Sequence, residues 1–203
     1  LDFTLTAEQI ALRRKAREFA LKEVLPVASY YDEKDETPLP VLRRAYEAEI
    51  MNTGIPKAYG GQGLGLIEAA ILTEELAAAC PGLATSIFDN SLGMEPLLLC
   101  DNEAARKHYL PRILKSFKQI CFATSEPLMG SDVSGIRCSA KADGDDFILD
   151  GTKYWITNGG LADYMTVFAT TDAKSKHEGI CAFLVEKDWA GVRVGRPIPK
   201  MGQ

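Results

Sequence analysis

The sequence has few of the residues that mark metal sites and redox centres. Its two histidines, His108 and His177, lie in no catalytic triad or metal-ligand pattern. Its five cysteines are far apart, and no Cys-x-x-Cys pair indicates zinc or dithiol chemistry. We therefore expect no metal site, and we expect the protein to work in a reducing cytoplasm.

Basic clusters and long apolar runs are also missing. The formal net charge is -5 and no stripe of Lys and Arg is present, which argues against a nucleic-acid partner. No run approaches the roughly 20 apolar residues of a membrane span. The start, Leu1-Asp2-Phe3-Thr4, lacks the basic and apolar stretches of a secretory signal. We expect neither a membrane span nor a signal peptide.

Helical patterns fill the first 118 residues of the 203. Thr6-Ala7-Glu8-Gln9 has the spacing of a capping box, and apolar residues then recur at helical intervals until Pro26. Four more helices are predicted, over residues 40–50, 66–79, 83–99 and 102–118. The fourth predicted helix, residues 83–99, is unusually apolar.

From Ile120 the pattern alternates with the period of strands. Strands are predicted over residues 120–125, 136–140, 147–150, 153–157, 164–170, 179–186 and 192–197. The expected fold class is α+β, with a helical domain at residues 1–118 followed by an antiparallel, barrel-like β domain at residues 119–203.

Two segments of the predicted β domain carry most of the chemical information. Residues 121–132 (CFATSEPLMGSD) and residues 154–160 (YWITNGG) each join a β-prone run to a turn rich in hydroxyls and backbone donors. Such turns suit one face of a flat polar ring and the phosphates attached to it. Together the two segments indicate a bound flavin.

Several motifs, in this order of domains, resemble the acyl-CoA dehydrogenase family of flavoproteins. They are the two segments above, residues 54–63 (GIPKAYGGQG), 74–77 (EELA), 90–93 (NSLG) and 109–111 (YLP). The resemblance implies a helical domain, a middle β domain and a C-terminal four-helix domain, with FAD and an acyl-CoA substrate between them. It also implies a homotetramer and an electron-transferring flavoprotein as acceptor. The chain would then stop inside the β domain, before the segment that usually supplies the catalytic glutamate.

The same resemblance assigns roles to individual residues. The flavin would be lined by Phe122, Ala123, Thr124 and Ser125, and by Trp155, Ile156 and Thr157, with Thr157 near the reactive N5. Gly130 and Ser131 would lie in the turn at the FAD pyrophosphate, where Ser131 could instead contact the bound thioester. Taken alone, Trp155 would read as a core residue, and Asp132 as a residue that satisfies backbone amides in a turn.

The turn itself departs from the family pattern. Leu128 and Met129 stand where the family commonly has Gly-Ala, so the turn loses a flexible glycine. We expect its shape to differ from the usual one.

One carboxylate in the apolar fourth helix is a candidate acid or base. Asp89 lies among apolar residues such as Leu92, on a narrow stripe with small polar residues. The resemblance places this helix along the acyl-binding cavity, where Asp89 and Leu92 would contact the substrate.

A carboxylate there resembles what an alicyclic acyl-CoA dehydrogenase, acting on cyclohexene carboxyl-CoA, would need. Burial would raise its pKa toward the range useful for proton transfer. The alternative is a helix residue that faces solvent or pairs with Asn90.

Three functions stay open at this point. The first is a FAD-dependent acyl-CoA dehydrogenase, which removes a proton and a hydride from its thioester substrate. The second is a flavin oxidase or monooxygenase of the same fold. The third is a subunit that binds CoA thioesters without catalysis.

Overall fold

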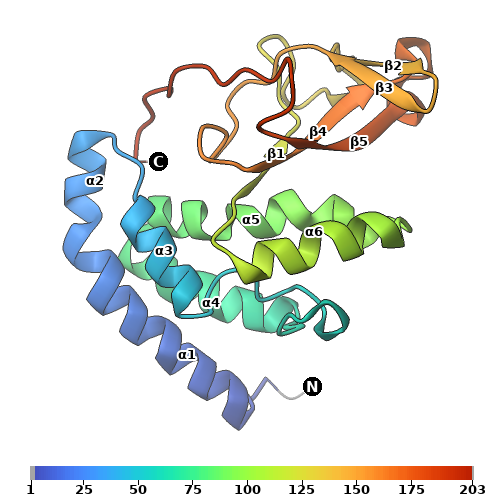
Figure 1. Ribbon diagram of the computed structural model, residues 1–203. Helices are drawn as coiled ribbons and strands as arrows, with labels where there is room; N and C mark the ends of the chain where they lie inside the picture. The colour runs from blue at the N-terminus through green and yellow to red at the C-terminus, as the bar shows by residue number, and fades with distance from the viewer. Residues whose placement is uncertain (1–2, 203) are drawn as a thin grey trace. The chain divides into compact units, whose positions relative to one another are not determined.

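Helices form the first part of the described chain and strands the second (Figure 1). The computed structural model describes residues 3–202. Residues 1, 2 and 203, at the outer ends of the two predicted domains, lie outside the described residues. The order of a helical part followed by a sheet part confirms the α+β prediction.

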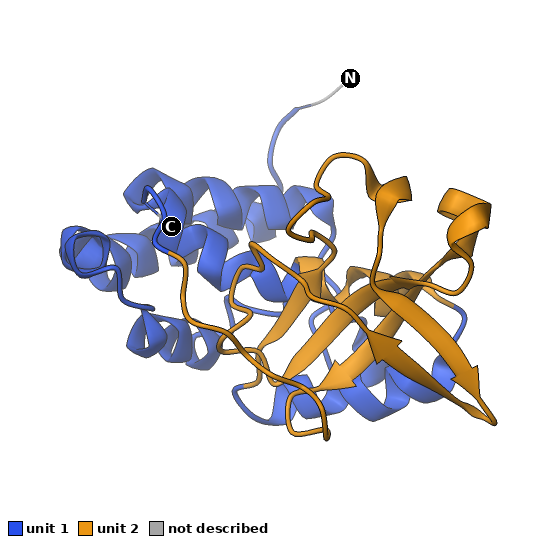
Figure 2. Cartoon of the chain, turned by 90° about the horizontal axis from the view of Figure 1, so that it is seen from above, with its two compact units in different colours: residues 1–91, 101–117, 199–203 blue, residues 92–100, 118–198 orange. Residues whose placement is uncertain are grey.

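Two compact units divide the chain (Figure 2). Unit 1 consists of residues 1–91, 101–117 and 199–203, and unit 2 consists of residues 92–100 and 118–198. The boundary crosses the helix α5, Pro81–Leu99, so the last part of this helix clusters with the sheet.

Unit 1 begins with the helix α1, Ala7–Phe19, whose capping box between Thr6 and Gln9 is present as predicted. The helical path does not stop at Pro26. A π turn, Ala20–Val24, and a 3-10 turn, Leu25–Val27, lead into the short helix α2, Ala28–Lys34, which the sequence pattern missed. Pro26 is tolerated because it lies in the first turn of a new helical segment, where its missing N–H costs no hydrogen bond.

The other helices lie close to their predicted positions. They are α3, Leu39–Glu47; α4, Leu66–Ala79; α5, Pro81–Leu99; and α6, Glu103–Lys115. The helix α1 packs against α4, and Arg17 of α1 holds the buried carboxylate of Glu75 on α4 through two hydrogen bonds of 2.7 and 2.8 Å. Apolar side chains of the same unit, including Val24, Leu42, Leu72 and Leu76, are fully buried.

Unit 2 contains one sheet of five strands. They are β1, Ile120–Ala123; β2, Ser139–Asp143; β3, Asp146–Asp150; β4, Tyr164–Thr170; and β5, Ile180–Glu186. The strand β4 pairs in parallel with β1 and antiparallel with β5, and β2 forms an antiparallel hairpin with β3. A parallel bridge between Ser139 and Thr170 joins β2 to β4. The sheet is therefore mixed, whereas the sequence predicted an antiparallel one.

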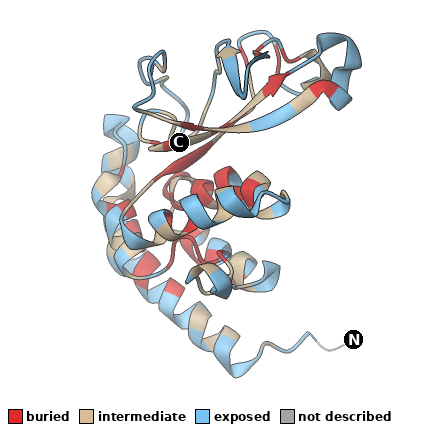
Figure 3. Cartoon of the chain, turned by 45° about the vertical axis from the view of Figure 1, so that its right-hand side comes forward, coloured by how far each residue is buried: buried red, intermediate tan, exposed pale blue. Residues whose placement is uncertain are grey.

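Among the five strands of the sheet, β1 and β4 have the largest share of buried residues (Figure 3). Cys138, Ala140 and Ala169 form a buried apolar cluster, with Leu149 and Phe183 packed against it. Most strand residues of β2 and β3 are exposed by contrast.

Two predicted strands are wrong, and a third is displaced. Residues 153–157 and 192–197 are irregular, and the strand expected over 136–140 begins at Ser139. The first error has a clear cause, because Trp155 and Asn158 both have positive φ, which interrupts an extended strand. The backbone and side-chain donors of residues 153–154 bind residues 124–125 instead.

Candidate functional site

The two segments singled out in the sequence lie side by side in unit 2. The backbone N–H of Tyr154 donates a hydrogen bond to the carbonyl oxygen of Ser125 at 2.9 Å. The ammonium of Lys153 donates to the carbonyl oxygen of Thr124, also at 2.9 Å. Thr124 and Ser125 follow directly after β1. The end of β1 and the irregular segment 153–157 therefore form one local structure.

Trp155 is the most unusual residue of this structure. Its φ is +61°, in the left-handed region that bulky residues rarely adopt. Its side chain is 52% exposed, and its indole makes an edge contact with the ring of Tyr154 at 4.9 Å between centroids. The core interpretation of Trp155 is therefore wrong. Backbone strain at an exposed aromatic side chain is typical of a binding site. Ile156 and Thr157 follow it and are half-buried.

The residues at the end of β1 differ in what they can offer to a ligand. Phe122 is half-buried and packs its ring against Phe168 of β4, with 4.8 Å between centroids. Ala123 is buried. The hydroxyl oxygen of Thr124 is buried and has no hydrogen-bond partner among the described residues. An unpaired buried hydroxyl is costly, so a ligand with a polar edge would fit beside it.

The turn after Ser125 is closed by its own backbone. Glu126 and Met129 exchange two backbone hydrogen bonds of 2.9 and 3.2 Å across Pro127 and Leu128. Met129 is buried while Leu128 is 77% exposed, so the methionine anchors the turn in place of the glycine–alanine pair.

Beyond this turn the chain is open to solvent. Gly130 and Ser131 are exposed, and a Cβ at Gly130 would meet no atom within 4 Å. The carboxylate of Asp132 accepts a hydrogen bond from the hydroxyl of Ser134 at 2.5 Å, which is a local turn contact. Its predicted contacts with backbone amides are replaced by this hydroxyl. The space at Gly130 would admit a phosphate close to the backbone.

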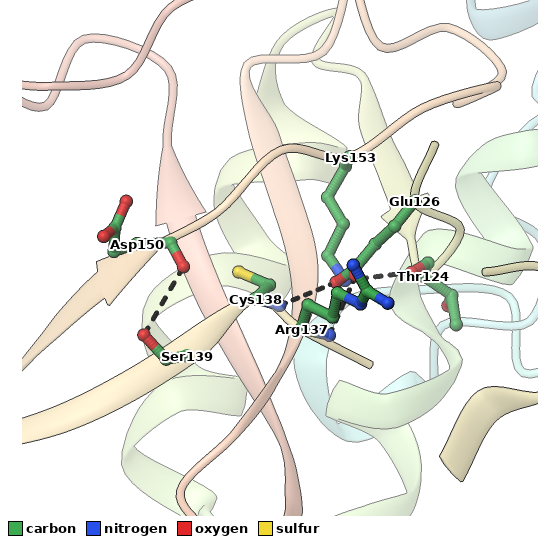
Figure 4. A network of polar contacts seen from close by, with 7 residues as sticks. All are labelled: Thr124, Glu126, Arg137, Cys138, Ser139, Asp150 and Lys153. Atoms are coloured by element: carbon green, nitrogen blue, oxygen red, sulfur yellow. Dashed lines mark hydrogen bonds and ion pairs between the residues drawn. The ribbon is translucent and has the colours of Figure 1, made fainter. Parts of the chain in front are cut away.

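Sequence reasoning missed an ion pair that links the two segments. The Nζ atom of Lys153 lies 2.9 Å from the Oε1 atom of Glu126 (Figure 4). The two side chains are only 11% and 5% exposed. Burial alone would raise the pKa of Glu126. The hydrogen bonds from Lys153 and from the backbone of Cys138 and Arg137 outweigh burial and lower this pKa. The signal was an acidic residue, Glu126, in the first segment and a basic residue, Lys153, directly before the second.

Asp89 lies in the part of α5 that belongs to unit 1. Its side chain is 7% exposed, and its Oδ2 atom is buried with no hydrogen-bond partner among the described residues. Burial raises the pKa of Asp89 to about 7, against the smaller opposing effect of the Lys200 ammonium. The solvent-facing alternative is therefore wrong.

The residues near Asp89 in sequence have different surroundings. Asn90 donates from Nδ2 to the Oδ1 atom of Asn52 at 3.0 Å, and both side chains are buried. Leu92, predicted to contact the substrate, is 52% exposed. Asp89 is thus a buried, incompletely paired carboxylate with a pKa in the range of a general acid or base at neutral pH.

Metal-binding side chains do not cluster among residues 3–202. His108 and His177 are exposed, and no group of three or more acidic, cysteine or histidine side chains in this range could hold a metal ion. The described helices include none with the length and apolar content needed to cross a membrane.

A helical unit joined to a mixed-sheet unit, with two irregular segments converging at the end of β1, defines the class of protein. Residues 6–116 match the N-terminal domain of acyl-CoA dehydrogenases, and residues 121–203 match the middle domain. The chain belongs to the acyl-CoA dehydrogenase family.

Known proteins of this family resemble the chain over nearly its whole length. An acyl-CoA dehydrogenase of Bacillus subtilis is 33% identical over 200 residues, which is 98% of this chain and 52% of the relative. Butyryl-CoA dehydrogenase from Megasphaera elsdenii superposes with a TM-score of 0.88 at 30% identity, over 94% of this chain and 51% of that one.

A third similar structure is an acyl-CoA dehydrogenase from Bacillus anthracis complexed with FAD. Its TM-score is 0.85 at 30% identity, with 97% of this chain and 34% of that chain covered. The present chain spans about half the length of the curated relatives it matches.

Proposed function

We propose that this chain is the FAD- and acyl-binding part of an acyl-CoA dehydrogenase that removes a proton and a hydride from an acyl-CoA thioester. One observation carries the flavin part of the proposal. The segments 122–125 and 153–157 are joined by two hydrogen bonds of 2.9 Å, beside a buried hydroxyl that lacks a partner among the described residues. The butyryl-CoA dehydrogenase and the FAD complex among the similar structures support the same reaction class.

The residues present fit a flavin. Thr124, Ser125 and Thr157 would offer hydroxyls and backbone groups to the polar edge of the ring, and the half-exposed indole of Trp155 would cover part of its surface. Gly130 and Ser131 would hold the pyrophosphate through backbone N–H groups and a hydroxyl. FAD bound there would supply two-electron oxidation, by accepting a hydride from the substrate.

Asp89 would carry the proton. A carboxylate whose pKa is raised to about 7 is present in both protonation states at neutral pH. It can therefore accept a proton at Oδ2 and release it to water in the same cycle. A charged group beside a simple fatty chain would only cost free energy. Asp89 thus favours a ring-containing or unsaturated acyl-CoA, such as cyclohexene carboxyl-CoA, whose reactive proton lies away from the α carbon.

The further parts of this proposal come from the family resemblance. They are an electron-transferring flavoprotein as acceptor and a homotetrameric assembly. A cytoplasmic location is proposed from the widely separated cysteines. The competing functions are a flavin oxidase or monooxygenase and a non-catalytic subunit that binds CoA thioesters.

The test is an anaerobic titration of the purified full-length protein with aliphatic and cyclic acyl-CoA thioesters, followed by the flavin absorbance. We expect bleaching, with the cyclic thioester effective at lower concentration. Rapid oxygen consumption by the reduced protein would instead support an oxidase. A colourless protein that refuses added FAD would contradict the proposal as a whole.

The role of Asp89 is tested separately by Asp89→Asn. The amide has the shape of the carboxyl group but cannot accept the proton. We expect FAD to remain bound while the rate of bleaching falls by roughly a hundredfold or more. The matched control is Asp101→Asn, which changes an exposed aspartate two residues after the end of α5. An Asp89→Asn variant that bleaches at the native rate would reject the catalytic role.

A further inference from the structure

A buried network within unit 2 joins the two segments that are proposed to line the flavin. The carboxylate of Glu126 accepts three hydrogen bonds: from the backbone N–H of Arg137 at 2.8 Å, from that of Cys138 at 2.9 Å and from Lys153 at 2.9 Å (Figure 4). The side chains of Glu126 and Lys153 are only 5% and 11% exposed. The carboxylate thus fixes the turn 126–129, the two residues before β2 and Lys153 to one another.

The ammonium of Lys153 also contacts the backbone two residues before Glu126. It donates to the carbonyl oxygen of Thr124 at 2.9 Å, in addition to its bond with Glu126. One residue later, Tyr154 donates its N–H to Ser125. The contacts from residues 153 and 154 therefore engage three consecutive residues, Thr124 to Glu126, at the end of β1.

Trp155 follows immediately after these contacts. Its left-handed backbone is unfavourable for a bulky side chain, and such a conformation persists only where the surrounding structure imposes it. The two residues just before Trp155, Lys153 and Tyr154, are both held by hydrogen bonds to the segment after β1. Loss of the Lys153 contacts would remove two hydrogen bonds that restrain the chain just before Trp155, so the indole should shift and become more accessible.

A contribution to stability does not by itself explain the pair. Removing two charges from water costs free energy that their attraction often fails to recover, and apolar residues of similar volume can replace such pairs. A lysine that spans a carboxylate and a backbone carbonyl instead fixes geometry, because its charge has good partners only in this one arrangement.

We propose that Lys153 and Glu126 are positioning residues that hold Thr124, Ser125 and Trp155 in the flavin-binding arrangement before the flavin arrives. This inference rests on the proposed flavin function for its purpose, whereas the contacts that carry it are all made between atoms of the protein itself. Preorganisation of this kind lowers the ordering cost of binding and fixes the groups that set the flavin potential.

The indole of Trp155 provides a direct readout. The chain has two tryptophans, so Trp189→Phe leaves Trp155 as the sole emitter. In this background we compare Lys153→Met, which keeps the length of the stem but loses the charge, with Lys153→Arg, which restores a cation and its donors. The measurements are acrylamide quenching of Trp155 in the flavin-free protein, and then FAD affinity and midpoint potential.

The expected pattern has three parts. Lys153→Met increases the quenching constant of Trp155 at least about twofold, weakens FAD binding by roughly tenfold and shifts the flavin potential. Lys153→Arg recovers most of each change. The control Lys118→Met removes another lysine of unit 2, paired with Asp163 at 2.7 Å before the opposite end of β1, and leaves all three readouts at the native values.

Other outcomes overturn the inference. Native quenching and native FAD affinity in a folded Lys153→Met would overturn it, as would equal changes in Lys118→Met. Should Lys153→Met not fold, Glu126→Gln carries the test. The amide keeps the volume but loses the charge that holds Lys153, so smaller changes in the same direction are required, and unchanged readouts would refute the role.

Failure of the proposed function would look different. In that case the native chain would bind no FAD, while Lys153→Met would still alter the quenching of Trp155 in the flavin-free protein. Native FAD binding together with unaltered quenching would refute the positioning role alone.

Discussion

Thr166 on β4 donates a hydrogen bond from its Oγ1 atom to the carbonyl oxygen of Gly93 on α5, at 2.6 Å within unit 2. Gly93 also has no room for a side chain, because a Cβ there would lie 2.7 Å from the carbonyl oxygen of Ile120 and 2.9 Å from its carbon. The missing side chain thus lets the backbone of α5 reach both β1 and β4. Gly93 is a packing residue that helps to position β1, the strand that leads into the residues proposed to line the flavin.

Replacing Gly93 by alanine should therefore destabilise the protein. The added methyl group would overlap backbone atoms of β1, which cannot move aside like a flexible side chain. We expect the free energy of unfolding to fall by about 2–3 kcal/mol, at the upper end of the cost of overpacking. Urea unfolding followed by circular dichroism measures it. Gly195→Ala is the control, since a Cβ at Gly195 would meet nothing within 4 Å, and equal losses in both variants would contradict this account.

Thr124 and Thr166 offer a matched pair of buried hydroxyls. The Thr124 hydroxyl has no partner in the described protein, whereas the Thr166 hydroxyl binds Gly93. We expect Thr124→Val to raise the flavin-free stability, because it removes a costly unpaired buried hydroxyl, but to weaken FAD binding. Thr166→Val should instead cost about 1–2 kcal/mol of stability, the value of a lost buried hydrogen bond, and leave FAD affinity native.

Urea unfolding and FAD titration of both threonine variants separate the two roles. If Thr124→Val bound FAD with native affinity, its hydroxyl would not be a flavin ligand. A loss of FAD affinity in Thr166→Val would show that the two effects cannot be assigned to separate residues.

Local chemistry made a large part of this fold predictable from sequence. The capping box at Thr6 set the start of α1, and the strongly apolar pattern of residues 66–79 gave α4 its bounds. Strand periodicity likewise gave β1, β4 and β5 within a few residues. In each case the local preference and the tertiary environment favour the same structure.

The segment 153–157 shows where such reasoning fails. Its alternation of Tyr, Trp, Ile and Thr is typical of a strand, yet tertiary hydrogen bonds to Thr124 and Ser125 hold it in an irregular path with a left-handed Trp155. The partner of Glu126 lies 27 residues away and no local rule joins them. The chemistry of the segments was readable from sequence, whereas the contacts that shape them were not.

Asp89 should make stability depend on pH in the direction opposite to that of most carboxylates. Its pKa is raised from 3.8 to about 7, so the folded protein binds a proton that the unfolded chain has released between these values. Stability therefore falls as pH rises through this window, by at most about 4 kcal/mol at roughly 1.4 kcal/mol per pH unit.

The variant Asp89→Asn should remove this pH dependence. It should match the native protein at about pH 4 and exceed its stability at about pH 9, where the native carboxylate is charged and buried. Urea unfolding at both pH values tests this, with the exposed Asp101→Asn as control. Parallel native and Asp89→Asn profiles would mean that Asp89 does not titrate in this window.

Trp155 should show opposite effects on stability and on binding. Asparagine tolerates the left-handed backbone better than tryptophan does, and the indole is half-exposed, so its removal sacrifices little burial. We expect Trp155→Asn to keep the flavin-free stability within about 1 kcal/mol of native, or to raise it, because strain at such a residue costs about 1–3 kcal/mol. FAD affinity should fall, since the flavin ring would lose an aromatic surface.

Trp189→Asn removes an equally exposed indole elsewhere in unit 2 and should leave FAD affinity native. A Trp155→Asn variant that loses stability but binds FAD normally would make the indole a structural residue, and the strained backbone would then need another explanation.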